Sequence, residues 1–197
     1  GLATCGKIPF ASSFAMFSAG RAFEQVRNSV GYPHLNVKIA GSHAGISVGE
    51  DGATHQCLED IALMRSLPNM TVLSPCDANQ AKLATIAAAE QVNGPVYIRF
   101  GREPVPNFTS ETDAFVLGKG QLLRKGSAVT IVATGHMVWE ALQAAVILEK
   151  KGIDARIVNI HTIKPIDREI LVSAARETGA VVTVEEHQVH GGLGGAV

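Results

Sequence analysis

The stretch TVLSPCDANQAKLATIAAAEQVNGPVYIRF, residues 71–100, contains a complete strand–helix–strand unit. Thr71–Pro75 and Pro95–Phe100 are short apolar runs of the kind found in strands buried on both faces of a sheet. Between them a helix is predicted over Asn79–Gln91, and Asp77 is well suited to cap its first turn. Strands joined by such a helix pair in parallel. The stretch therefore predicts an α/β fold.

The same alternation of strands and helices extends on both sides of this unit. Before it, a strand is predicted over Asn36–Ala40 and a helix over Leu58–Leu67. After it, the predicted elements are a strand over Ala128–Ala133, a helix from Met137 to Lys151 that ends at Gly152, a strand over Ala155–Ile160, a helix from Asp167 to Arg176, and a strand over Ala180–Val184. The pattern predicts two three-layer αβα domains with mainly parallel sheets.

The segment Glu103–Asp113 contains two prolines and has no hydrophobic periodicity. We therefore place a linker at 106–113, between one domain over 1–105 and another over 114–197. Both domains are expected to be incomplete, because Gly1–Cys5 reads like the inside of a helix and Gly191–Val197 opens a loop or a new element.

Charged residues make up 18% of the 197 residues, against about 25% in a typical globular protein, and the net charge is −1. A hydrophobic content of 46% excludes a disordered tail, and the lack of a basic stripe argues against nucleic-acid binding. The longest uncharged runs, Ile8–Gly20 and Ser127–Trp139, are shorter than the roughly 20 residues that span a bilayer. We expect a soluble protein, without membrane or nucleic-acid partners, that buries some surface against another chain. Three irregularly spaced cysteines indicate reduced thiols and a cytoplasmic location.

The loop predicted over Gly41–Gln56 combines two histidines, His43 and His55, with an acidic pair that includes Asp51, and with four glycines. It follows a predicted strand, and ligands of open α/β sheets bind at the carboxyl ends of strands. Imidazoles and a carboxylate suit a polyol, and histidine moves protons near neutral pH. The pair Asp51–Gly52 is also an ordinary turn signal. We interpret the loop as a functional site.

Two further segments are candidates for binding. Phe14 and Phe17 lie three residues apart, so on a helix they would share a face and could form a wall for a flat heterocycle, although the pattern alone favours core packing. Arg102 follows the strand that ends near Arg99, where an arginine could fork onto a phosphate or simply be solvated.

The remaining histidines and glycines carry no distinctive motif. The Gly191 cluster is interpreted as a tight turn. The Glu185–His190 segment has no further ligands at zinc-like spacing, so we interpret it as a solvated strand end. The other three, His34, His136 and His161, are interpreted as packing or surface residues.

Several motifs in this order resemble the transketolase family of thiamine-diphosphate enzymes. The motifs are Ser13–Phe17 (SFAMF), Gly49–Gln56 (GEDGATHQ), Met64–Asn69 (MRSLPN), Ile98–Arg102 (IRFGR), His161–Pro165 (HTIKP) and Val184–His187 (VEEH). The chain is similar to the C-terminal half of a transketolase, which contains a pyrimidine-binding domain followed by a C-terminal domain. It is most like the split form of the family, in which the diphosphate-binding half is a separate polypeptide.

On the cofactor side, the resemblance implies that Phe17, helped by Phe14, stacks on the aminopyrimidine ring of thiamine diphosphate. It places His55 near both the cofactor and the reacting carbon, which makes His55 the catalytic candidate. Two features depart from the family pattern. Gly20 stands where an aromatic residue is common, and the glutamate that activates the cofactor belongs upstream of Gly1 and is absent from this chain.

On the substrate side, the resemblance implies that His43 and Arg102 hold the sugar phosphate and that Asp51 accepts a hydroxyl of the donor ketose. The reaction would transfer a two-carbon ketol unit from a ketose phosphate to an aldose phosphate, as in the pentose phosphate pathway. The diphosphate and Mg²⁺ would be held by a partner chain, so no metal ligand is expected here. A homodimer joined by N-terminal diphosphate-binding subunits, a heterotetramer, is expected, and this chain alone should be inactive.

Two alternatives stay open. The related 1-deoxyxylulose-5-phosphate synthases share G-x-D-G-x-T-H-Q, but normally carry Asp-Arg-Ala-Gly where this chain has Ser42–Gly45, so His43 favours a transketolase. The other alternative is a non-catalytic subunit that only dimerises and docks, which the missing glutamate supports.

Overall fold

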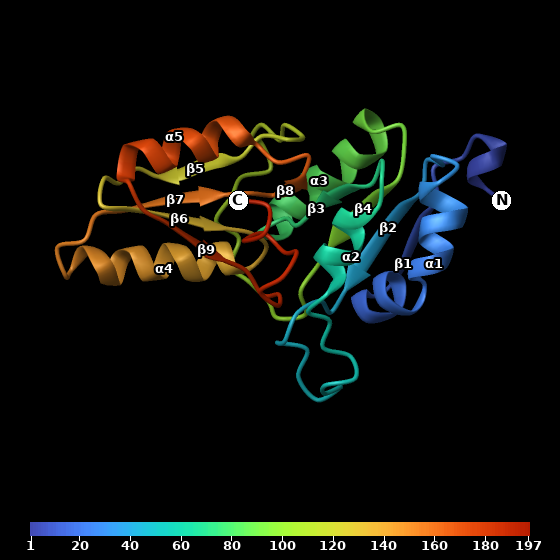
Figure 1. Cartoon of the computed structure of the whole chain (residues 1–197), viewed down its shortest axis with the longest axis horizontal. Helices are drawn as coiled ribbons and strands as arrows, with labels where there is room; N and C mark the ends of the chain where they lie inside the picture. The colour runs from blue at the N-terminus through green and yellow to red at the C-terminus, as the bar shows by residue number, and fades with distance from the viewer.

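The computed structural model describes residues 1–197 and arranges the strands in two mainly parallel sheets (Figure 1). The first sheet contains, in spatial order, β1 (Phe10–Phe14), β2 (Lys38–Ser42), β4 (Val96–Arg99), β3 (Thr71–Leu73) and β8 (Thr162–Lys164). The second contains β5 (Gln121–Arg124), β7 (Ala155–Asn159), β6 (Val129–Ala133) and β9 (Val181–Val184). Only the β3–β8 and β5–β7 pairs are antiparallel. The predicted fold class is confirmed.

The helices cover the faces of these sheets, and α4 and α5 lie on opposite sides of the second sheet (Figure 1). Their bounds are α1 (Phe23–Val26), α2 (Asp60–Ser66), α3 (Ala78–Gln91), α4 (Met137–Glu149) and α5 (Arg168–Thr178). The Asp77 carboxylate caps α3 by accepting a hydrogen bond from Gln80 N, and Asp167 caps α5 through Glu169 N and Ile170 N. These caps fix where both helices begin.

The N-terminal region differs from the sequence-based expectation. Gly1–Cys5 is not the inside of a helix but contains a single 3₁₀ turn, Ala3–Cys5. Phe14 ends the strand β1, and only Phe17 lies in the wide helical turn Met16–Arg21, so the two rings do not share a helix face. The strand forms because it pairs with β2 along its whole length, although most of its residues stay exposed.

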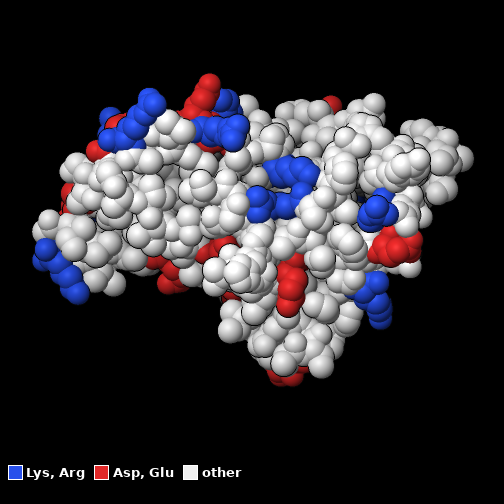
Figure 2. All heavy atoms as spheres, in the orientation of Figure 1, with Lys and Arg blue, Asp and Glu red and all other residues white.

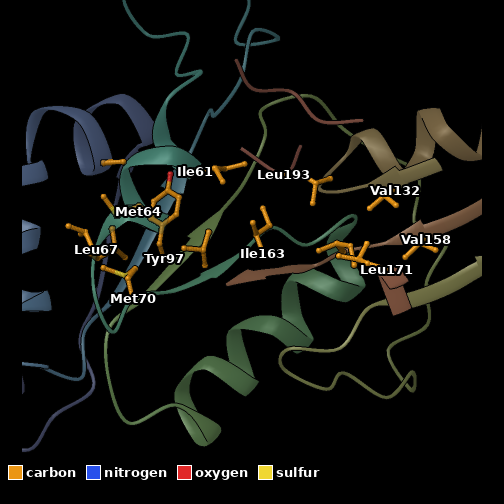
Figure 3. Close-up of a cluster of buried hydrophobic side chains, with 14 of the residues drawn as sticks. Ile61, Met64, Leu67, Met70, Tyr97, Val132, Val158, Ile163, Leu171 and Leu193 are labelled. Carbon is orange, nitrogen blue, oxygen red and sulfur yellow. The ribbon is translucent and has the colours of Figure 1, made fainter. Parts of the chain in front are cut away.

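The two halves of the chain share one hydrophobic core (Figure 3). Met64 and Tyr97 from the first half belong to the same buried cluster as Val132 and Leu171 from the second. Ile163, on β8, lies between these groups, because β8 crosses over to extend the first sheet. Residues after the predicted linker therefore help to complete the first sheet, while the proposed domain boundaries themselves stay a prediction.

Charged side chains are sparse on the face shown in Figure 2, where small acidic and basic groups are separated by broad uncharged areas. Large apolar side chains that are exposed include Leu2, Phe10, Tyr32 and Val189. No helix of the structure combines the length and the apolar character needed to cross a membrane.

Candidate functional site

The carboxyl ends of β1 and β2 bring the first two site residues together. Because these strands are parallel and Phe14 pairs with Ser42, the residue after Ser42 lies beside the Phe14 ring. His43 stacks on that ring with the centroids 4.0 Å apart and the planes inclined by 15°. Its backbone has a φ of +54°, which is uncommon outside glycine, and its Nδ1 lies 3.1 Å from Ser42 Oγ. A tight turn at the strand end therefore aims this imidazole at Phe14.

Two more rings complete an aromatic cluster around Phe14. Phe17 lies parallel to Phe14, with a centroid distance of 6.0 Å and an angle of 6° between the planes. His55 presents its edge to both rings, at 5.7 Å from Phe14 and 5.1 Å from Phe17. The Arg21 guanidinium lies 4.6 Å above the Phe17 ring, a cation–π distance. The strand end, the helical turn and the returning loop thus converge, and the four predicted ring residues lie together.

The acidic part of the loop forms a turn just before His55, whose backbone N donates to Gly52 O at 3.0 Å. Gly49 and Gly52 have positive φ values, and Gly52 N donates to Gly49 O at 3.1 Å, so Asp51 sits on an exposed turn. Its side chain is unpaired. The predicted turn is therefore present, and it exposes the Asp51 carboxylate to solvent in the same loop that carries His55.

Arg102 reaches this turn from the end of β4. Its guanidinium lies 3.3 Å from the Glu50 carboxylate and 3.5 Å from that of Glu103, and its side chain is 36% exposed. A Cβ added at Gly49 would lie 3.3 Å from the guanidinium, so the loop passes close to it. Ion pairs this exposed contribute only about 0–1 kcal/mol, so an incoming anion could displace them.

A buried network below the loop was missed by the sequence-based interpretation. The Glu185–His190 segment is not simply a solvated strand end, because Glu186 is only 7% exposed and its Oε1 accepts a hydrogen bond from Ser47 N at 2.5 Å. Its Oε2 pairs with Nε2 of His136, a residue interpreted as packing or surface. Burial raises the pKa of the Glu186 carboxyl, but the contacts with His136 and Ser47 outweigh burial and lower it to about 2.

A second buried group fixes the base of the site. Asp60 Oδ2 accepts hydrogen bonds from Tyr97 Oη at 2.8 Å and from Arg99 Nε at 2.9 Å, and all three side chains are buried. Burial, together with the Asp60 charge, raises the pKa of the Tyr97 hydroxyl well above its usual value. Arg99 also donates to Glu186 O at 2.6 Å, which joins the two halves of the chain. Only the VEEH motif hinted at this network in the sequence.

The Gly191 turn and His161 occupy structural positions, whereas His34 is exposed. The Glu185 carboxylate accepts from Leu193 N and Gly194 N, and Arg65 donates to Gly191 O and Gly192 O. His161 is buried and packs its ring 4.2 Å from that of Phe115. Among the His, Cys, Asp and Glu side chains, no group of three or more is arranged to hold a metal ion.

Comparison with known proteins gives consistent matches along the whole chain. Residues 1–107 match the transketolase pyrimidine-binding domain, and residues 118–197 match the transketolase C-terminal domain. The chain is 50% identical to the 6-deoxy-6-sulfo-D-fructose transketolase subunit SqwH of Clostridium sp. strain MSTE9, over 100% of this chain and 61% of that protein. It is 43% identical to a 1-deoxy-D-xylulose-5-phosphate synthase of Thermomicrobium roseum, over 100% of this chain and 31% of that protein.

Among solved structures, a split gene transketolase described as an inactive beta4 tetramer matches with a TM-score of 0.92 and 58% identity. The match covers 99% of this chain and 63% of that one. The chain thus spans less than two thirds of the length of the subunit relatives that it matches.

Proposed function

The chain belongs to the transketolase family, and from this premise we propose that it acts as the C-terminal subunit of a split transketolase, or as part of one. The reaction is the transfer of a two-carbon ketol unit from a ketose phosphate to an aldose phosphate. The observation that carries this proposal is the aromatic cluster, in which Phe14 and Phe17 lie parallel with His43 and His55 against them. The cluster lies within the part of the chain that matches the pyrimidine-binding domain.

The cluster fits the pyrimidine half of thiamine diphosphate. Parallel phenyl rings offer flat apolar faces on which a heterocycle can stack, and the imidazoles supply polar edges beside them. When bound, this cofactor would supply the nucleophilic carbon for the transfer of the two-carbon unit. In this proposal the diphosphate and Mg²⁺ are held by a partner chain.

The polar residues around the cluster have separate roles in this proposal. His55 moves a proton at the reacting carbon, since an imidazole gains and loses protons near neutral pH. Asp51, exposed and unpaired, accepts a hydroxyl of the donor sugar. His43 and Arg102 bind the phosphate, for which Arg102 exchanges its exposed carboxylate partners.

The assembly that completes the site is also a proposal. We propose a homodimer of this chain joined to N-terminal diphosphate-binding subunits, forming a heterotetramer in the cytoplasm and serving pentose phosphate metabolism. The name of the solved split transketolase, an inactive beta4 tetramer, supports the requirement for a second subunit. The isolated chain is therefore expected to show no turnover, and measurable ketol transfer by it alone would contradict this arrangement.

The decisive experiment uses the full-length subunit reconstituted with its diphosphate-binding partner. Ketol transfer from xylulose phosphate to ribose phosphate should be measurable, and His55→Ala should lower kcat about 10²- to 10⁴-fold, the usual contribution of a proton-transferring group. His190→Ala is the matched control, because His190 is exposed and lies outside the cluster. If His55→Ala behaves like this control, the assignment of His55 is wrong.

The same preparation tests a second function. The similarity to the synthase of Thermomicrobium roseum favours 1-deoxyxylulose-5-phosphate synthesis as the alternative, although Ser42 and His43 argue against it. Product formation from pyruvate and glyceraldehyde phosphate, without ketol transfer, would favour the synthase. If neither reaction occurs in the complete assembly, a subunit that only dimerises and docks is the remaining candidate.

A further inference from the structure

The second half of the chain supplies no ring to the aromatic cluster, yet it contacts the loop that carries part of the site. Glu186, just after β9, accepts a hydrogen bond from Ser47 N at 2.5 Å, across 139 positions of sequence. Ser47 begins the part of the loop that leads through Asp51 to His55. The Glu186 carboxylate therefore ties this segment to the second half of the chain.

The backbone of the loop is shaped to let this carboxylate approach. Gly45 has a φ of +96°, a backbone conformation that residues other than glycine rarely adopt. A Cβ at Gly45 would lie 2.3 Å from Cδ of Glu186, so no larger residue fits without displacing the carboxyl group. Position 45 thus requires glycine for two reasons, the positive φ of its backbone and the close approach of the Glu186 carboxyl group.

His136 extends the same contact to the arginine side of the site. Its Nε2 pairs with Glu186 Oε2, which has no other donor. Its other ring nitrogen faces Gly101, where an added Cβ would lie 2.6 Å from Nδ1. Gly101 immediately precedes Arg102, so the His136 ring supports the backbone from which Arg102 projects. The Glu186–His136 pair therefore contacts both segments that carry the substrate-side residues.

Glu186 is anchored through its own backbone and through a neighbouring residue. Arg99 donates to Glu186 O at 2.6 Å and is itself held by Asp60, and Gln188 N donates to Leu58 O at 3.0 Å. By contrast, a hollow of about 470 Å³ borders Ser47 and Glu186, and the Ser47 hydroxyl is buried without a partner. The loop has room to shift when the contact to Glu186 is lost.

We propose that Glu186 and His136 are positioning residues of the transketolase reaction, which hold the Ser47–Thr54 segment and Arg102 in register for binding the sugar phosphate. The inference rests on the proposed function. It gives the second half of the chain a defined role in catalysis, since a displacement of about 1 Å in a binding group can lower the rate about 10²-fold.

The test uses the reconstituted full-length subunits with Glu186→Ala, Glu186→Gln and Glu140→Ala. Glu140 is the matched control, because it is exposed on α4 one turn from His136 and pairs with no residue. Glu186→Ala should lower kcat/KM for a phosphorylated acceptor about 10- to 100-fold, mostly through KM, and should change that of an unphosphorylated acceptor less than threefold. Glu186→Gln keeps an oxygen for Ser47 N and should recover most of the loss.

Two further measurements separate positioning from general damage. The Kd of thiamine diphosphate should change less than twofold in Glu186→Ala, because Phe14 and Phe17 lie on β1 and the turn after it. Adding His136→Ala to Glu186→Ala should lower kcat/KM little further, since each substitution already removes the Glu186–His136 contact.

The outcomes are distinguishable. An equal fall with both acceptors, or values like those of Glu140→Ala, overturns the positioning role while leaving the proposed function intact. A wild-type complex without ketol transfer overturns the proposed function itself.

Discussion

Replacing Asp60 with alanine should destabilise the protein more than any exposed substitution, because Asp60 joins two other buried side chains. Its carboxylate is fully buried and accepts hydrogen bonds from Tyr97 Oη at 2.8 Å and from Arg99 Nε at 2.9 Å. Without Asp60, the Arg99 guanidinium keeps only the carbonyl oxygen of Glu186 as a partner. A buried charge that loses its counter-ion is strongly unfavourable.

The size of the effect follows from this geometry. Removing one partner of a buried ion pair costs about 3–5 kcal/mol. With a urea dependence of about 2 kcal/mol per molar, this lowers the denaturation midpoint by about 1.5–2.5 M. Asp60→Asn keeps an oxygen for Tyr97 and Arg99 but loses the charge, so its midpoint should lie between those of the wild type and Asp60→Ala.

Urea unfolding followed by circular dichroism measures these shifts, with the protein concentration and the oligomeric state kept the same for all variants. The matched control is Glu111→Ala, which breaks the Lys82–Glu111 pair, whose side chains are 55% and 57% exposed. An exposed pair contributes about 0–1 kcal/mol, so its midpoint should move by less than about 0.5 M. If Asp60→Ala shifts the midpoint no more than Glu111→Ala does, the network does not hold the base of the site as argued.

Two other predictions concern pH and packing. Burial lowers the pKa of His161 to about 4, while an unfolded histidine titrates near 6.5, so the unfolding free energy should rise with pH between these values, by up to about 1.4 kcal/mol per unit. His161→Gln should remove this part of the slope in urea titrations at several pH values, and an unchanged slope would refute the assignment. A Cβ at Gly41 would lie 2.2 Å from Tyr97 Oη, so Gly41→Ala should lower the unfolding free energy by about 1–3 kcal/mol. An unaltered urea midpoint would show that the Tyr97 ring yields freely.

The elements that the sequence predicted well are those with strong local signals. The helix α3 follows a capping aspartate at Asp77, and β6 is an apolar run interrupted only by Thr130. The strands that were missed, β1, β5 and β8, have no such pattern. In β1, FASSF has small polar residues and mostly exposed side chains, so the strand depends on pairing with β2. β8 is three residues long and exists through pairing with β3. Neither pairing can be inferred from local periodicity.

The candidate site was likewise predicted only in part from the sequence. The loop over Gly41–Gln56 attracted attention because its composition is unusual in a short span, and the structure brings His43 and His55 onto the Phe14 ring. Glu186 was overlooked because its environment is made by residues distant in the sequence, Ser47 among them. A carboxylate next to another acidic residue reads as solvated unless its partners are known.

Contacts between the two halves of the chain support the candidate site. β8 extends the first sheet, a shared core joins both sheets, and Arg99 links Asp60 to Glu186 across the halves. The predicted linker divides the chain in sequence, but the packing joins the two halves through a shared core. Because Ser47 N donates to Glu186, the position of the loop segment that carries Asp51 depends on a residue from the second half of the chain. The second half is, in this sense, part of the support of the site.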